Sequence, residues 1–272
     1  MVQILKFVVL FAYIAALYYY VLDFTGKRRG FLLKPVNVLQ TAIVIHLFYW
    51  GALYFNSGKL PIGSLFGALT TFVLLISLIY MFIEIVVKDR SFGIFLLPLV
   101  ILLQGISSIF IRADAIQSPI LENAIFEIHV ISMIVSYSAF SLGAIAGVMH
   151  LLLSQKIKRQ KLGILYINLP SLQFLSQVIV ISVYFGFVFL TAGMLLGFFN
   201  AFQVPEAGIS FFDPKIISVI LTWAIYGYFI LRHLLKRLGA KESAYLSLVG
   251  FLMIFFTFFV VNILMTTFHL FP

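Results

Sequence analysis

The side chains with the greatest capacity for chemistry in this chain are its five histidines, since cysteine is absent. A neutral imidazole is a common metal ligand, and two imidazoles that face each other can fill both axial positions of a haem iron. An ionisable side chain inside an apolar helix is costly and commonly functional, although a histidine there can also hydrogen-bond a neighbouring helix. In chain order the histidines are His46, His129, His150, His233 and His269.

His129 and His269 are predicted to lie at one membrane level, at the outer ends of two different helices. An outer loop that emerges at the same level carries Phe211 and Phe212, which could flank a macrocycle. Two interpretations of this pair stay open: axial ligands of a haem iron, or interfacial histidines that only bind water.

The other three histidines are predicted to lie deeper or at the opposite membrane face. His46 falls near the middle of its helix, about 15 Å from the cytoplasmic end at 1.5 Å per residue, where a metal contact and a hydrogen bond to a neighbouring helix are both open. His150 and His233 fall near cytoplasmic helix ends, where contact with water or with the last helical carbonyls is favoured.

Templates for other chemistry are missing from the sequence. There is no His-Glu-x-x-His helix, no phosphate-cradling glycine loop and no nucleophile elbow. Glu84 is the one carboxylate well inside a predicted span, and its spacing from Lys88 predicts a structural i,i+4 ion pair. We therefore expect no catalytic residue and no enzyme activity of the chain on its own.

The elements that must position these residues are membrane-spanning helices. Of 272 residues, 63% are hydrophobic and only 10% charged, with a mean hydropathy of +1.14, so lipid must be the solvent for most of the surface. Each span needs about 20 mostly apolar residues. The predicted fold is an all-α integral membrane protein with eight transmembrane helices, at 3–23, 36–55, 63–87, 92–110, 127–153, 172–200, 216–231 and 244–268.

Loop charge predicts the orientation of these helices. The net charge of +9 arises mainly from loops that follow the first, third, fifth and seventh predicted helices, which hold 14 of the 18 Lys and Arg. Basic residues accumulate on the cytoplasmic side of a membrane, so these loops are predicted to be cytoplasmic and both termini to lie outside. The charge is thus explained by topology in the cytoplasmic membrane, and no nucleic-acid partner is expected.

Three segments in the C-terminal half resemble the cytochrome c assembly proteins of the CcsA/ResC type. They are FEIHVISMIVSYSAFSLG from Phe126, FDPKIISVILTWAIYGYFILRH from Phe212 and GFLMIFFTFFVVNILMTTFHLF from Gly250. The N-terminal half, with its histidine at position 46 and a Leu-Pro in the fourth predicted helix, is similar to the HemX/YpjD branch. The resemblance implies that residues 1–272 form a single transmembrane domain that handles haem.

The same resemblance implies roles for individual residues. His129 and His269 match the two outer histidines of the family, which ligate external haem, here expected as haem b. His46 matches a histidine of an inner haem site, and His233 lies two positions beyond the second histidine of that site, where this chain has Leu231. The outer loop, NAFQVPEAGISFFDPK, lacks the tryptophans of the family, and the outer contacts expected from it are Phe211, Phe212, Asp213, Pro214 and Lys215.

The missing tryptophans favour a haem carrier or regulator of the HemX-like type over a complete cytochrome c synthetase. Besides haem and the lipid bilayer, the implied partners are a large-ectodomain cytochrome c assembly subunit or glutamyl-tRNA reductase. Two alternatives stay open: the haem-presenting subunit of a cytochrome c synthase, and a haem transporter.

Overall fold

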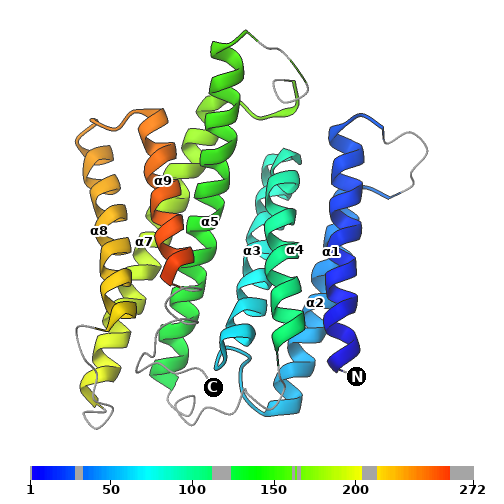
Figure 1. Cartoon of the computed structure of the whole chain (residues 1–272), viewed down its shortest axis with the longest axis vertical. Coiled ribbons are helices and arrows are strands. Elements are labelled where there is room, and N and C mark those ends of the chain that lie inside the picture. Colours follow the sequence, from blue (N-terminus) through cyan, green and yellow to red (C-terminus); the bar gives the residue numbers. More distant parts are fainter. Residues whose placement is uncertain are drawn as a thin grey trace. The chain divides into compact units, whose positions relative to one another are not determined.

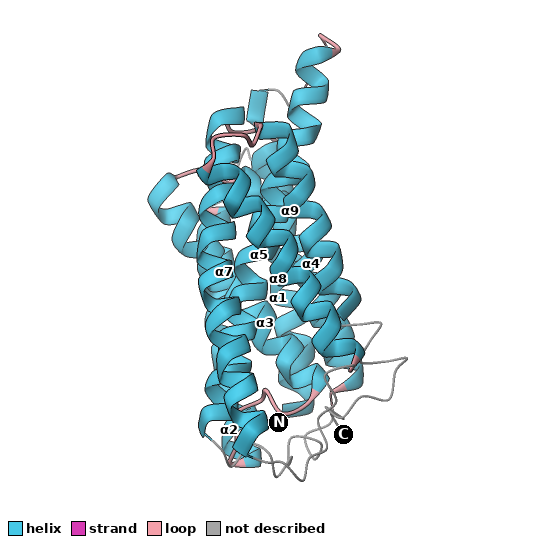
Figure 2. Cartoon of the chain, turned by 90° about the vertical axis from the view of Figure 1, so that its left-hand side faces the viewer, coloured by secondary structure: helices cyan, strands magenta, loops and turns pink. Residues whose placement is uncertain are grey.

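The computed structural model describes residues 2–27, 33–111, 124–160, 163, 167–203 and 213–257. Every regular element in these ranges is a helix, as Figure 2 shows. The chain divides into two compact units. The first comprises Met1–Gln117 with Leu152–Leu172, and the second comprises Ser118–Leu151 with Gln173–Pro272.

The first unit contains four helices that pack side by side in Figure 1, where α1 and α3 each contact α2 and α4. Local signals set their ends: Gly58, in the left-handed conformation with φ 70°, closes α2, and the Ser64 hydroxyl caps α3 by accepting from the Gly67 N–H. The helices are α1 (Val2–Phe24), α2 (Pro35–Ser57), α3 (Leu65–Val87) and α4 (Ser91–Phe110).

The second unit is built around the long helix α5, whose final turns from Leu152 belong to the first unit. Small residues bring its neighbours close: a Cβ added at Gly147 would lie 3.0 Å from the Ala244 carbonyl oxygen of α9. On α5 the Phe140 ring stacks on Tyr226 of α8 with centroids 3.7 Å apart. The helices are α5 (Ala124–Lys158), α7 (Leu172–Gln203), α8 (Pro214–Leu234) and α9 (Ala240–Phe255).

The prediction of an all-helical membrane protein is confirmed. Seven of the described helices are long and apolar enough to cross a membrane, and they expose large apolar side chains such as Phe48 and Phe55, which are 72% and 85% exposed. The chain is therefore a multi-pass membrane protein. The eighth predicted span begins within α9, and its remainder lies outside the described residues. The orientation of the termini stays a prediction.

The predicted orientation can be tested with reporter fusions. Fusions at Lys158 and Arg237 should report the cytoplasm, and fusions at Glu122 and Pro272 should report the outside, because basic loops are retained on the cytoplasmic side. Paired alkaline phosphatase and green fluorescent protein reporters measure this directly. An external signal at Lys158 would reverse the map.

Candidate functional site

His129 lies in the second turn of α5 and is held by a carbonyl of α7. Its Nδ1 hydrogen-bonds the backbone oxygen of Gly193 at 2.7 Å. A carbonyl oxygen can only accept, so Nδ1 carries the proton, and in a neutral ring Nε2 then keeps its lone pair. A metal-ligating histidine usually has its other ring nitrogen fixed in this way. His129 thus has the tautomer that an iron ligand needs.

Two glycines one turn apart on α7 make room for this arrangement. A Cβ added at Gly197 would lie 2.8 Å from Cε1 of His129, and one added at Gly193 would lie 2.8 Å from the sulfur of Met133. The close approach of α5 and α7 therefore depends on both positions. They form a Gly-x-x-x-Gly sequence, which is the signal by which they could have been found before the structure.

The Asp-Pro-Lys segment of the outer loop begins α8. The Asp213 carboxylate accepts the backbone N–H of Lys215 at 2.8 Å, and Pro214 occupies the first helical turn, where a missing N–H costs nothing. The start of α8 and the start of α5 lie at the same end of the second unit in Figure 1. His269, Phe211 and Phe212 lie outside the described residues, and their part in this site stays a prediction.

His46 is fully buried in the first unit, with hydrogen bonds at both ring nitrogens. Its Nδ1 pairs with the Tyr13 hydroxyl and its Nε2 with the Thr70 hydroxyl, each at 3.0 Å. The sequence left a metal contact and a hydrogen bond to a neighbouring helix open for His46, and the structure shows hydrogen bonds to two neighbouring helices. Iron could reach either nitrogen only after Tyr13 or Thr70 had released the ring.

His233 and His150 belong to the second unit. The Nδ1 of His233 forms a 3.0 Å hydrogen bond with the Tyr184 hydroxyl of α7. His150 is 3% exposed, and its Nδ1 has no hydrogen-bond partner among the described residues. Because His46 and His233 lie in different units, an inner haem site that involves both stays a prediction.

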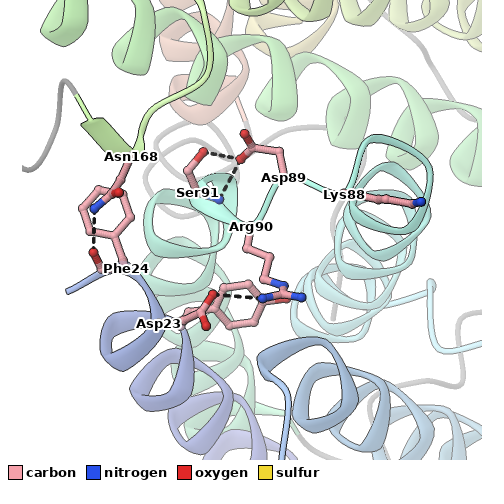
Figure 3. A pocket seen from close by; sticks show the side chains of 8 residues that line it. Asp23, Phe24, Lys88, Asp89, Arg90, Ser91 and Asn168 are labelled. Atoms are coloured by element: carbon pink, nitrogen blue, oxygen red, sulfur yellow. Dashed lines mark hydrogen bonds and ion pairs between the residues drawn. The ribbon is translucent and has the colours of Figure 1, made fainter. Parts of the chain in front are cut away.

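A pocket of about 290 Å³ opens at one end of the first unit, shown in Figure 3. Several of its polar groups are paired with one another: Arg90 contacts Asp23 at 3.2 Å, Asp89 accepts the Ser91 N–H at 2.8 Å, and the Asn168 amide donates to the Phe24 carbonyl at 2.7 Å. The Arg90 contact ties the end of α1 to the turn between α3 and α4, and the Asn168 contact ties it to the segment before α7, which are structural roles.

The expected ion pair between Glu84 and Lys88 is replaced by other contacts. Glu84 accepts a hydrogen bond from the Tyr20 hydroxyl, and the Nε of Arg90 lies 3.7 Å from its second oxygen. Lys88 ends α3 in the left-handed conformation, with φ 60°, so the α-helical spacing that the prediction assumed does not hold there.

Fold and site together define a class: a multi-pass helical membrane protein with a histidine near the end of a helix whose Nδ1 is bonded to a backbone carbonyl. No cluster of three or more His, Asp or Glu able to hold a bare metal ion occurs among the described residues. The chain belongs to the cytochrome C assembly protein family, whose model matches residues 62–269. The resemblance expected from the sequence is confirmed.

Individual relatives cover most of the chain. It is 27% identical over 258 residues to the cytochrome c biogenesis protein CcsA of Heterosigma akashiwo, covering 81% of this chain and 79% of the relative. It is 25% identical over 273 residues to protein HemX of Bacillus subtilis, covering 95% of this chain and 94% of the relative. No solved structure matches the chain.

The geometry around His129 predicts the effect of a single methyl group. Gly197→Ala should push the imidazole away from the Gly193 carbonyl and cost about 1–3 kcal/mol through overpacking. Thermal unfolding measures the loss, and ¹⁵N-histidine NMR reports whether Nδ1 still carries the proton. Gly227→Ala is the matched control, because its Cβ would meet only the Phe187 ring at an ordinary 3.7 Å. Equal behaviour of the two variants would contradict this packing.

Proposed function

We propose that this chain is a haem-binding protein of the cytoplasmic membrane that handles haem as a carrier or regulator of the HemX-like type, without bond-making chemistry of its own. The observation that carries the proposal is the bond from His129 Nδ1 to the Gly193 carbonyl, which leaves the Nε2 lone pair for iron. Membership of the cytochrome C assembly protein family supports the same cofactor.

The proposed haem b site lies at the outer end of the second unit. His129 is the proposed first axial ligand and His269 the second, with Phe211 and Phe212 against the porphyrin face. Haem carries two propionate groups, and the proposed partner for one of them is the Lys215 ammonium, in the first turn of α8. Asp213 acts indirectly, since its cap fixes the start of the helix that carries Lys215.

A role in carrying or regulating haem is favoured over presentation to a second protein by the positions of the tryptophans. The chain has two, and each indole is hydrogen-bonded to a threonine of a neighbouring helix: Trp50 donates to Thr71 at 3.0 Å and Trp223 donates to Thr191 at 3.1 Å. Neither indole belongs to the outer loop. Phenylalanines can pack on a porphyrin, so binding is expected to persist where delivery to an acceptor is impaired.

The alternative function is that of a haem-presenting subunit in a cytochrome c synthase. The names of several relatives, which are cytochrome c biogenesis proteins, favour this alternative. It would require a large-ectodomain assembly subunit as partner, whereas a regulator could act on glutamyl-tRNA reductase. A haem transporter is the third candidate, and haem flux into vesicles would distinguish it.

The purified protein should show the low-spin absorption spectrum of haem iron with two nitrogen ligands. His129→Ala should weaken haem binding by more than the roughly 10–100-fold that loss of an outer-shell partner costs, or convert the iron to high spin. Haem titration followed by absorption spectroscopy measures both effects. His150→Ala is the control on the same helix, about 30 Å further along α5. An unchanged spectrum and affinity in His129→Ala would remove this residue from the site.

Expression in a host stripped of cytochrome c assembly genes separates the first two functions. We expect no covalent c-type cytochrome, because the outer loop lacks the indoles that would hold the haem edge, together with a change in haem or haem-precursor levels. Haem staining of denaturing gels and extraction of total haem are the measurements. Stained cytochrome c in that host would favour the synthase, and a requirement for a supplied large-ectodomain partner would make this chain one of its subunits.

A further inference from the structure

Buried side chains in the first unit form a chain of hydrogen bonds that starts on α1, passes through the other three helices and returns to α1. The α1 backbone between its two ends completes a ring. All five side chains of the ring are fully buried, at 0% exposure. From α1 the ring runs through α2, α3 and α4 and closes on the backbone of α1. Its members are Tyr13, His46, Thr70, Gln104, Ser108 and the carbonyl group of Lys6.

The carbonyl group at the end of the ring sets the direction of its first bonds. The oxygen of Lys6 can only accept, so the Ser108 hydroxyl donates to it at 3.1 Å. Because the Ser108 hydroxyl proton points at Lys6, its oxygen accepts from the Gln104 amide nitrogen, at 3.2 Å. The amide is thereby oriented with its oxygen toward α3, where it accepts the Thr70 hydroxyl proton at 2.9 Å.

The same logic then fixes the tautomer of His46. Because the Thr70 hydroxyl proton is directed at Gln104, its oxygen must accept, so the Nε2 of His46 carries a proton. In the neutral ring the lone pair is then on Nδ1, where the Tyr13 hydroxyl donates to it. The one lone pair of His46 is therefore occupied inside the bundle. His129 has the reverse tautomer, with its lone pair on Nε2.

We propose that His46 is a positioning residue that closes this ring and binds no iron, so that the chain holds one haem, at the outer site. The count of one rests on the proposed function, whereas the ring stands without it. A satisfied buried network specifies one arrangement of the helices that share it. The Gln104 amide gives the ring a structural role and not one in proton transfer, because an amide N–H donates a hydrogen bond but does not release its proton.

The test uses three substitutions within the ring. Thr70→Val removes a hydroxyl at nearly constant volume and takes the partner from the His46 Nε2 and from the Gln104 amide oxygen. His46→Leu removes the imidazole, whereas His46→Gln restores a donor and an acceptor but no imidazole for iron. Thr222→Val is the matched control, since this buried hydroxyl bonds only the Ser218 carbonyl of its own helix, at 2.8 Å.

Haem-free protein in detergent is melted first. Thr70→Val and His46→Leu should each lower the apparent melting temperature by roughly 3–10 °C, and the double variant should lose much less than the two shifts added together. His46→Gln should recover most of the loss, and Thr222→Val should change little. ¹⁵N-histidine NMR should show His46 protonated at Nε2. Additive losses, or a proton on Nδ1, would overturn the ring.

Haem is then counted per chain. Wild type and His46→Gln should each bind one haem, with the same spectrum. Two haems in wild type and one in His46→Gln would assign iron to His46 and overturn the inference. No haem in wild type would refute the proposed function and the count of one, while the melting and NMR results would still decide whether the ring exists. The failures of the two proposals are therefore distinguishable.

Discussion

A polar group inside a bilayer has no water to bond, so it must find its partner within the protein. Most features of this chain follow from that constraint. In the first unit it drives five buried side chains into one ring, and it leads Glu84, at the end of α3, to a hydroxyl and a guanidinium from neighbouring segments. Side chains that face the other way are apolar and exposed, as expected where lipid replaces water.

The same constraint produces different chemistry at two histidines. At His129 the neighbour is a backbone carbonyl, which takes the Nδ1 proton and leaves Nε2 with a lone pair. At His46 the neighbour of Nε2 is the Thr70 hydroxyl, which donates its own proton to Gln104 and therefore accepts from Nε2. The lone pair of the ring is then on Nδ1, where it accepts from the Tyr13 hydroxyl. Identical residues thus carry the proton on different ring nitrogens because of the acceptor that each one faces.

Glycine decides where the helices of the second unit approach closely enough for such contacts. Gly193 and Gly197 leave space on α7 for Met133 and His129, and Gly250 leaves space on α9 for the Tyr226 ring that stacks on Phe140. A side chain at any of these positions would separate the helices, and for His129 it would also break the bond that sets its tautomer. The packing of these helices and the tautomer of His129 therefore depend on the same small residues.

The sequence by itself determined the helical membrane fold, the ends of most helices within a few residues, and the family, because apolar length and turn residues are local properties. It also singled out His129 and placed it near a helix end. Only the tertiary structure decided which nitrogen of His46 and of His129 carries the proton, that Glu84 meets Tyr20 and Arg90 instead of Lys88, and that His46 belongs to the ring. Those outcomes depend on partners contributed by other helices, which lie 24 and 33 residues away for His46 and 64 residues away for the Tyr20 contact of Glu84 and the Gly193 contact of His129.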